Sequence, residues 1–444
     1  MAEFKAPRGT ADVLPDESGL WLRVEETVRR VCRNAGYGEI RTPIFEHTEL
    51  FERGVGAVTD IVEKEMYTFP DKAGRSMTLR PEGTAPCMRA YLEHNLQARP
   101  QPVKMYYIGP MFRYERPQSG RFRQHTQFGV EAIGSGDPAL DTEVVSILVD
   151  VYRNLGLSGF VVHLNTIGCP ECRPRYKEAL VRTLSGRVED LCSDCRRRLE
   201  RNPLRVLDCK NEVCREISRD VPTIFEFLCE ECRDHFEGVT TYLEALGLTY
   251  DIDPRIVRGL DYYTKTVFEV VHAGLGAQDV LGGGGRYDGL AGDLGGDHTP
   301  GVGFAAGIER AVMVLKAASA AAASADGADA AGGPGRGGVR VFVATMGASA
   351  RVEGFRLAQA LRDRGLPTEL DYMGRSLKAQ MKQANRCKAA KVVILGDEEL
   401  ATRVATLKDM STGEQSQVAL ERLVQALSDD EAPCRDDGPG GAVR

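Results

Sequence analysis

An Ala/Gly-rich run near the end of the chain does most to constrain how the chain can fold. Residues 316–338 read KAASAAAASADGADAAGGPGRGG, and none of them is a large apolar residue. A segment of this composition cannot bury a core, so we interpret 316–338 as a linker between separately folded parts. At 444 residues the chain is also too long for one ordinary core, which agrees with this division.

The part after the linker has the pattern of a small α/β domain. The segments VRVFVAT, PTELDY and KVVILG are strand-like and alternate with two helical stretches. This βαβαβ order predicts a parallel sheet over residues 339–429. The remaining residues, 430–444, are acidic and rich in Gly and Pro, which predicts a disordered tail.

The part before the linker alternates between strand-like and helical segments. Residues 19–33 carry apolar positions at helical spacing, residues 103–134 have the pattern of a hairpin with a polar loop, and residues 137–155 have the pattern of a helix. From Cys169 to Leu248 the chain becomes helical, charged and rich in cysteine, and the strand pattern then returns. We therefore divide this part into 1–168 and 249–315, a single domain interrupted by a helical insertion at 169–248.

Composition places the chain among globular proteins, with 42% hydrophobic and 27% charged residues. No apolar stretch approaches 18 residues, and the N-terminus is charged and rich in Pro and Gly. We therefore expect no membrane span, no signal peptide and a cytoplasmic location. The net charge of −7 decides nothing about nucleic-acid partners, because binding depends on local patches.

Eight of the twelve cysteines lie between positions 169 and 232. Cys169-x2-Cys172, then 19 residues, then Cys192-x2-Cys195 has the spacing of a zinc site. Cys209 and Cys214, with Cys229-x2-Cys232, could form a second site of four thiolates. Such sites are structural and would help a small insertion to fold. One site with spare cysteines, or eight thiols without metal, remain as alternatives, and the spacing does not fix the pairing.

Two polar stretches precede the insertion. In LRPEGTAPCM, Glu82 and Thr84 stand at the start of a helix, where they either cap it or bind a cationic group. In FRYERPQSGRFRQHTQFGVE, four arginines lie within eleven residues, and Gln127 and Glu131 share one face of the following strand. Guanidinium groups bind phosphate oxygens, so this loop is either a phosphate site or a solvated charged loop.

Two further stretches follow the insertion. VRGLDYYTKTVFEVV places Arg258, Tyr262 and Tyr263 in front of a strand, which needs none of these groups in order to form. Four consecutive glycines in DVLGGGGRYDG suggest a phosphate cradle after a strand, but the Gly-Lys-Ser/Thr of a P-loop is missing. Glycines here let the backbone lie close to a ligand or to another strand. PGVGFAAGIER indicates a strand that leads into a helix carrying Arg310.

In this order, the stretches resemble the three motifs of class II aminoacyl-tRNA synthetases, and in particular histidyl-tRNA synthetases. The helix with IRTPIFE resembles motif 1, the dimer-forming element, the arginine hairpin resembles motif 2, and GVGFAAGIER resembles motif 3. RGLDYYTKTVFE and GGGGRYDGL resemble the two signatures of the histidine enzymes. The resemblance implies an α+β fold with an antiparallel catalytic sheet of six or seven strands, a helical Cys-rich insertion and a C-terminal α/β anticodon-binding domain.

The resemblance also implies roles for individual residues. For histidine binding, the resemblance places Glu82 and Thr84 on the α-ammonium and Gln127 near the amino acid. It places Glu131, Tyr262 and Tyr263 around the imidazole. For catalysis, the resemblance places Arg258 at the reacting carboxylate. For ATP, it places Arg113 on the α-phosphate, Arg121 and Arg310 on the outer phosphates, and Glu115 near the adenine or a metal. Arg116 and Gln118 are expected to meet the tRNA acceptor end. His125 stands where the family often has a phenylalanine on the adenine.

The activity implied is the ligation of histidine to its tRNA through histidyl-adenylate, with ATP and Mg²⁺, in a homodimer. The insertion is expected to touch the acceptor arm of the tRNA. In the C-terminal domain, residues 374–396 carry six cationic side chains along helices, either an RNA footprint or an ordinary solvated face. The alternative function is a regulatory relative that binds histidine without catalysis. Such a protein should lack the C-terminal domain and the arginines that this chain retains.

Overall fold

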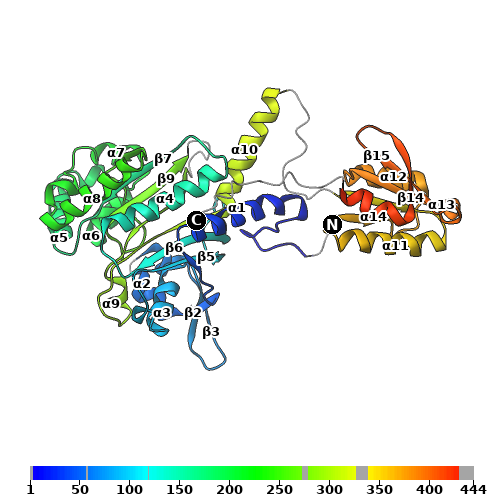
Figure 1. Cartoon of the computed structure of the whole chain (residues 1–444). Helices are drawn as coiled ribbons and strands as arrows, with labels where there is room; N and C mark the ends of the chain where they lie inside the picture. The colour runs from blue at the N-terminus through cyan, green and yellow to red at the C-terminus, as the bar shows by residue number, and fades with distance from the viewer. Residues whose placement is uncertain (1–3, 57–58, 119, 273–278, 327–338, 430–444) are drawn as a thin grey trace, which may run out of the picture. The chain divides into compact units, whose positions relative to one another are not determined.

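The computed structural model describes residues 4–56, 59–118, 120–272, 279–326 and 339–429, which form two compact units divided between Ala331 and Gly332 (Figure 1). The predicted tail, 430–444, and the second half of the predicted linker, 327–338, lie outside the described residues. Over 316–326 the structure differs from the expected linker, because a helix that begins at Ile308 continues to Asp326. Alanine is the strongest helix former, so a run of alanines extends a helix that is already nucleated.

The first unit is built on one large sheet. Its strands, in spatial order, are β1 (Gly38–Glu39), β5 (Val103–Phe112), β6 (Gln124–Ile133), β11 (Gly301–Gly307), β10 (Val280–Arg286), β9 (Thr264–His272), β7 (Phe160–Thr166) and β8 (Tyr250–Ile252). The six strands from β5 to β7 pair antiparallel. Short parallel strands at both edges, β1 and β8, raise the number to eight, above the six or seven expected.

Helices and a smaller sheet surround the large sheet. The helices are α1 (Pro15–Asn34), α2 (Thr48–Val55), α3 (Thr84–Glu93), α4 (Pro138–Asn154), α9 (Leu290–Asp293) and α10 (Ile308–Asp326), with short turns η1 (Ile61–Glu65) and η2 (Leu96–Ala98). Strands β2 (Phe45–His47), β4 (Ser76–Leu79) and β3 (Tyr67–Pro70) form the smaller sheet. The helices predicted at 19–33 and 137–155, the hairpin β5–β6 and the β11-to-α10 transition are confirmed.

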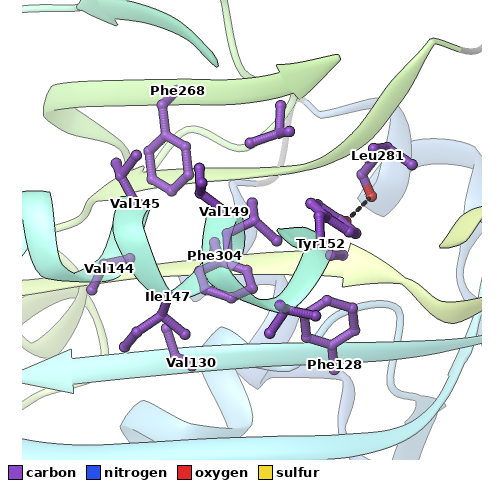
Figure 2. Close-up of a cluster of buried hydrophobic side chains, with 14 of the residues drawn as sticks. Phe128, Val130, Val144, Val145, Ile147, Val149, Tyr152, Phe268, Leu281 and Phe304 are labelled. Carbon is purple, nitrogen blue, oxygen red and sulfur yellow. Dashed lines mark hydrogen bonds between the residues drawn. The ribbon is translucent and has the colours of Figure 1, made fainter. Parts of the chain in front are cut away.

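Helix α4 packs its apolar side chains on the large sheet and forms the centre of the core (Figure 2). Asp137 caps this helix by accepting a hydrogen bond from the Ala139 amide (2.9 Å), and Pro138 occupies the first turn. Phe128 and Phe304, from neighbouring strands, meet edge to face. Each such buried aromatic side chain stabilises the fold by about 1.5–3 kcal/mol.

The four consecutive glycines lie inside strand β10 rather than after a strand, and the expectation that they let the backbone lie close to another strand is confirmed. A side chain at Gly284 would meet the carbonyl oxygen of Gly303 at 2.0 Å, and one at Gly283 would meet the Phe268 carbonyl oxygen at 2.6 Å. The two neighbouring strands therefore approach β10 too closely for any side chain at these positions.

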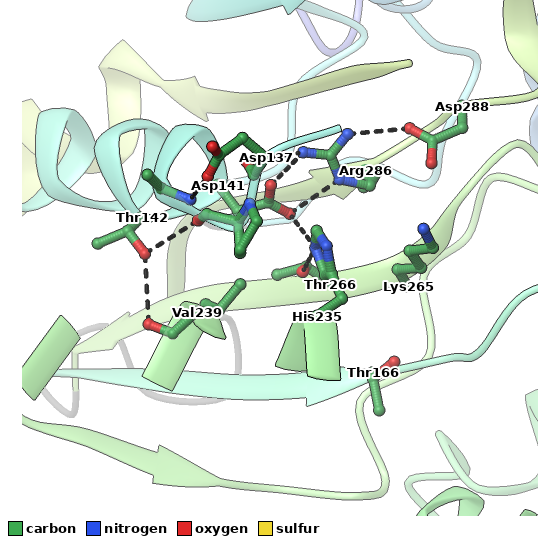
Figure 3. A network of polar contacts seen from close by, with 12 residues as sticks. Asp137, Asp141, Thr142, Thr166, His235, Val239, Lys265, Thr266, Arg286 and Asp288 are labelled. Carbon is green, nitrogen blue, oxygen red and sulfur yellow. Dashed lines mark hydrogen bonds and ion pairs between the residues drawn. The ribbon is translucent and has the colours of Figure 1, made fainter. Parts of the chain in front are cut away.

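A buried polar network fixes the end of β10 (Figure 3). Arg286 is fully buried and pairs with Asp141 on α4 and with Asp288 (3.1 Å). His235 contacts both Asp141 (3.2 Å) and Thr266 of β9 (3.2 Å). Burial raises the pKa of Asp141, but the hydrogen bond from His235 and the charge of Arg286 lower it below its ordinary value. The network therefore holds an ionised carboxylate inside the protein and joins four elements: α4, β9, β10 and the helix over residues 230–245.

The insertion is helical, as predicted. It contains α5 (Cys172–Ser185), α6 (Ser193–Arg201), α7 (Glu212–Ile217) and α8 (Glu230–Ala245), linked by turns η3 (Val188–Asp190), η4 (Pro203–Val206) and η5 (Ile224–Phe227). Its last helix, α8, packs on helix α4, where Thr142 donates a hydrogen bond to the Val239 carbonyl (3.3 Å).

The second unit has one five-stranded sheet in the order β13 (Thr368–Leu370), β12 (Val341–Thr345), β14 (Lys391–Leu395), β15 (Val404–Asp409) and β16 (Gln415–Ala419). Its helices are α11 (Ala348–Arg362), α12 (Leu377–Arg386), α13 (Asp397–Thr402) and α14 (Leu420–Asp429). The first three strands are parallel, as predicted, and β15 and β16 add an antiparallel hairpin. Among the described helices of both units, none is long and apolar enough to cross a membrane.

Candidate active site

A cavity of about 360 Å³ opens on the large sheet of the first unit. The predicted site residues that line it are Glu82, Thr84, Arg113, Glu115, Arg121, His125, Gln127, Arg258, Tyr262, Tyr263 and Arg310. They come from the start of α3, the hairpin β5–β6, the segment before β9 and the first turn of α10. Three predicted residues do not line it: Glu131 lies beneath it, and Arg116 and Gln118 are exposed on the hairpin loop.

Glu82 and Thr84 form one end of the cavity. The carboxylate of Glu82 accepts hydrogen bonds from the amides of Thr84 (2.6 Å) and Ala85 (2.9 Å), so this residue caps α3. Burial raises its pKa even though these amides favour the charged form. The Thr84 hydroxyl donates to Glu131 (2.8 Å), which leaves its lone pairs to accept from a ligand. Capping and ligand binding are therefore compatible here.

Glu131 is fully buried below this end of the cavity. It accepts hydrogen bonds from Thr84 and from the hydroxyl of Tyr287. Burial raises the pKa of Glu131 to about 8, against the effect of these two hydrogen bonds. The rings of Tyr262 and Tyr263 lie 4.7 Å apart between their centroids, and Tyr262 meets Tyr287 edge to face at 5.7 Å. Three tyrosines thus surround one protonatable carboxyl group.

Three arginines, two from the loop of the hairpin β5–β6 and one from α10, converge at the other end. Arg113 donates from Nε to the Pro81 carbonyl (2.8 Å), and Arg121 pairs with Glu115 (2.5 Å). Arg310 donates to the carbonyls of Gly120 (3.2 Å) and Val280 (2.5 Å), which ties the hairpin loop to β10. Like charges repel one another, and a bound anion offsets that repulsion. Several arginines in one cavity are therefore typical of a site for an anion with several phosphates.

Arg258 lies between the two ends. Its Nη1 is 2.5 Å from the Oε1 of Glu269, and its guanidinium lies 5.6 Å from the centre of the Tyr263 ring. Gly283 faces it, and a side chain there would come within 2.9 Å of Nη1. The glycine strand therefore leaves room for this arginine at the centre of the cavity.

Several buried polar atoms of the cavity have no hydrogen-bond partner in the described part of the chain. They are Nδ1 of His125, Oε1 of Gln127, Nε of Arg258 and Oε2 of Glu309. Leaving one such atom unpaired costs about 1–3 kcal/mol, so their grouping in one cavity indicates a polar ligand.

His125 stays neutral. Burial, together with the charges of Arg113 and Arg310, lowers its pKa to about 3. A neutral imidazole beside two arginines presents a flat, uncharged ring, which suits the predicted stacking on a base better than an imidazolium would.

Sequence reasoning missed five residues around the cavity: Asp208, Lys210, Glu269, Tyr287 and Glu309. Glu269 was detectable, because it is a charged residue in the otherwise apolar strand TVFEVV. Asp208 and Lys210 were not, because they belong to the insertion and reach the cavity only through its fold. Burial raises the pKa of Glu309 to about 7, while its carboxylate accepts from the Thr126 amide (2.7 Å).

The insertion brings its eight cysteines into two groups of four. One contains Cys169, Cys172, Cys229 and Cys232, the other Cys192, Cys195, Cys209 and Cys214, and within each group the sulfurs lie within 4.8 Å of one another. The sequential pairing of 169, 172, 192 and 195 is therefore wrong, because α5 and η3 separate these two pairs and the chain returns to each later. Three of the sulfur–sulfur distances within these groups are 3.5, 3.9 and 3.8 Å. In a tetrahedral zinc site with Zn–S bonds of about 2.3 Å, the sulfurs lie ~3.8 Å apart, so the distances agree.

In the second unit, the cationic residues of α12 lie on one exposed face. Lys378, Lys382 and Arg386 are spaced by four residues and all are exposed, while Gln380 and Ala384 on the opposite face are buried. Tyr372 and Met373, just before this helix, are 63% and 72% exposed. Cations beside an exposed aromatic ring are typical of a surface that binds single-stranded RNA.

An antiparallel sheet whose polar cavity joins a carboxylate and tyrosine end to an arginine end defines the catalytic fold of a class II aminoacyl-tRNA synthetase. A model of the histidyl-tRNA synthetase family matches residues 9–311, and a model of the anticodon-binding domain matches residues 340–430. The chain belongs to the histidyl-tRNA synthetase family.

Similar proteins span almost the whole chain. The histidine–tRNA ligase of Desulforamulus reducens is 53% identical over 418 residues, 94% of this chain and 97% of the relative. That of Halothermothrix orenii is 51% identical over 425 residues, 96% and 99% of the two chains. The crystal structure of apo histidyl-tRNA synthetase from S. aureus matches with a TM-score of 0.77 and 39% identity, covering 96% of this chain and all of that one.

Proposed function

We propose that this protein ligates histidine to its tRNA in two steps, through histidyl-adenylate with release of pyrophosphate. The observation that carries the proposal is the single cavity in which an acidic and tyrosine-rich end faces converging arginines across Arg258. An amino acid and a nucleoside triphosphate fit these two ends, with the carboxylate and the α-phosphate meeting at the centre. The near full-length similarity to histidine–tRNA ligases supports the same activity.

The acidic end receives histidine. Glu82 and the accepting Thr84 hydroxyl bind the α-ammonium, and Gln127, whose Oε1 is unpaired, adds a third acceptor. The tyrosines and Glu131 recognise the imidazole, because buried hydroxyls left unpaired by an analogue reject that analogue strongly.

The arginine end receives ATP. Arg113 is anchored through Nε, which leaves its terminal nitrogens for the α-phosphate, and Arg121 and Arg310 bind the outer phosphates. Arg258 stabilises the negative charge that develops as the carboxylate attacks the α-phosphorus, a task of positioning and electrostatics rather than of proton transfer. His125 stacks on the adenine.

A divalent metal fits the same end. Glu115 and the unpaired Oε2 of Glu309 are hard oxygen donors of the kind that Mg²⁺ prefers, and Glu115 would hold the ion beside the phosphates. When bound, Mg²⁺ neutralises phosphate charge and so eases departure of pyrophosphate.

Two zinc ions fit the cysteine groups. Four sulfurs that lie within 4.8 Å of one another supply all four ligands of a closed structural site. We expect one Zn²⁺ in each group.

The tRNA is the acceptor. Arg116 and Gln118 are exposed beside the cavity and are free to meet the acceptor end, and the α12 face of the second unit suits the anticodon. Ile44 and Phe45, in the segment resembling motif 1, are 46% and 52% exposed, which supports a homodimer through that segment. We place the enzyme in the cytoplasm, where its tRNA and reduced thiols are found.

The test is ATP–pyrophosphate exchange with each of the twenty amino acids, without tRNA. Exchange with histidine alone is the expected result. Histidine binding without any exchange would contradict the proposal and would favour the regulatory alternative, which this chain otherwise resembles little because it keeps Arg113, Arg258, Arg310 and the C-terminal domain.

A further inference from the structure

Two charged residues of the insertion reach the catalytic cavity. Asp208 and Lys210 both line it, although they lie between η4 and α7, far in sequence from every other lining residue. Both are exposed, while Cys209 between them is 8% exposed. The backbone at Cys209 therefore decides where these two side chains stand.

Cys209 belongs to the second cysteine group, with Cys192, Cys195 and Cys214. Its sulfur is 3.8 Å from that of Cys192. Both cysteines also line a groove of about 770 Å³ that shares Arg113, Arg121 and Arg258 with the cavity. The metal group is thus part of the wall beside the arginine end, and not a remote feature of the insertion.

Lys210 stands apart from the other cations of the cavity. Arg121 is paired with Glu115 and Arg258 with Glu269, whereas Lys210 makes no ion pair or hydrogen bond within the described residues. An unpaired lysine next to a phosphate-binding end is available to bind an anion as a point charge. Its short connection to a metal ligand restricts where the ammonium group can go.

We propose that zinc in the group Cys192, Cys195, Cys209 and Cys214 acts as a clamp that holds Lys210 at the arginine end, where its ammonium binds a phosphate of ATP. The inference rests on the proposed function and deepens it, because the insertion then supplies a substrate-binding residue. Loss of a structural metal outside the cavity would weaken ATP binding inside it.

The ATP contact is tested with Lys210→Ala. A lost charge-assisted contact raises the KM for ATP in histidine-dependent exchange by about tenfold, with kcat within about twofold. Lys210→Arg should restore most of the affinity, and both variants should keep two zinc ions per chain by elemental analysis. Arg182→Ala is the matched control, because Arg182 is an exposed cation of α5 away from the cavity. An unchanged KM for ATP in Lys210→Ala would overturn the proposal.

The clamp is tested with Cys209→Ser. Zinc should fall from two to one per chain, the KM for ATP should rise as in Lys210→Ala, and the double variant should be no worse than Cys209→Ser alone. Zinc loss with unchanged KM would refute the clamp. If Cys209→Ser does not fold, partial chelation of the wild type followed by return of Zn²⁺ measures the same coupling through ATP affinity by calorimetry.

Two further results separate the possibilities. An increase in the KM for tRNA alone, with exchange unaltered, would assign Lys210 to a phosphate of the tRNA and would overturn its assignment to ATP. If the wild type shows no exchange, the proposed function fails, yet equilibrium binding of ATP to the wild type and Lys210→Ala still decides the role of Lys210.

Discussion

Replacing Arg258 with alanine should abolish most of the activation step while the fold survives. The side chain is 18% exposed, lies 2.5 Å from Glu269 and has a buried Nε without a partner. Alanine removes the only part of this residue that reaches the centre of the cavity, and it leaves a Glu269 carboxylate that is 25% exposed and can be solvated.

The expected loss follows from the charges. Two unit charges about 4 Å apart attract by about 4 kcal/mol at an effective dielectric constant of about 20, which corresponds to about three orders of magnitude in rate. Removing one donor that stabilises transition-state charge costs about 10²–10³ in kcat in other enzymes. We therefore expect kcat for exchange to fall by about 10²–10³. The lost ion pair should cost only about 1 kcal/mol of unfolding free energy, because its partner is partly solvated.

The assay is histidine-dependent ATP–pyrophosphate exchange at saturating histidine and ATP, with thermal unfolding of each variant. Arg255→Ala is the matched control, since Arg255 is three residues earlier, 46% exposed and paired with Asp253 outside the cavity. A folded Arg258→Ala variant that keeps more than about a tenth of the wild-type kcat would refute the reasoning.

Three other changes have defined outcomes. Glu131 keeps its proton in the folded state up to a pKa of about 8, whereas the unfolded chain releases it near pH 4.5, so the unfolding free energy falls as pH rises through that window. Glu131→Gln should flatten this fall in denaturation measured at about pH 5 and about pH 8, and an unchanged slope would mean that another group titrates. His125→Phe removes the unpaired Nδ1 and keeps a flat ring, so the KM for ATP should drop about two- to fivefold, and a rise would show that the ring does not stack. Removal of both zinc ions by a chelator should unfold the insertion first, seen as a low-temperature transition by calorimetry; a single transition at the wild-type temperature would exclude a structural role.

Much of this architecture is encoded locally and was therefore predictable. Helix α4, the hairpin β5–β6 and the turn from β11 into α10 follow from periodicity and from capping residues such as Asp137. The eleven predicted residues that line the cavity were found because their motifs occur in a fixed order. What local patterns do not contain is the way distant segments meet.

Three outcomes show that limit. The glycines of β10 predicted a close approach of the backbone to a ligand or to another strand, but which strands approach is a property of the folded sheet. The cysteine pairing depends on which segments of the insertion meet, so linear spacing left the pairing open and the fold decides it. Lys210 reaches the cavity only once the insertion has folded, and its local sequence carries no sign of that position.

The first cysteine group also bears on how the large sheet forms. Strands β7 and β9 are antiparallel neighbours, yet the whole insertion lies between them in the chain. Cys169 lies three residues after β7 and contacts Cys229, 60 residues later. At the start of β9, the backbone amide of Lys265 donates to the Gly168 carbonyl (2.9 Å). A metal ion at this group would shorten the loop that must close before the two strands can pair, and closing loops is the slow part of folding a sheet with distant partners. Zinc supplied during synthesis would thus set how quickly a new chain completes its sheet and how long its strand edges stay open to aggregation.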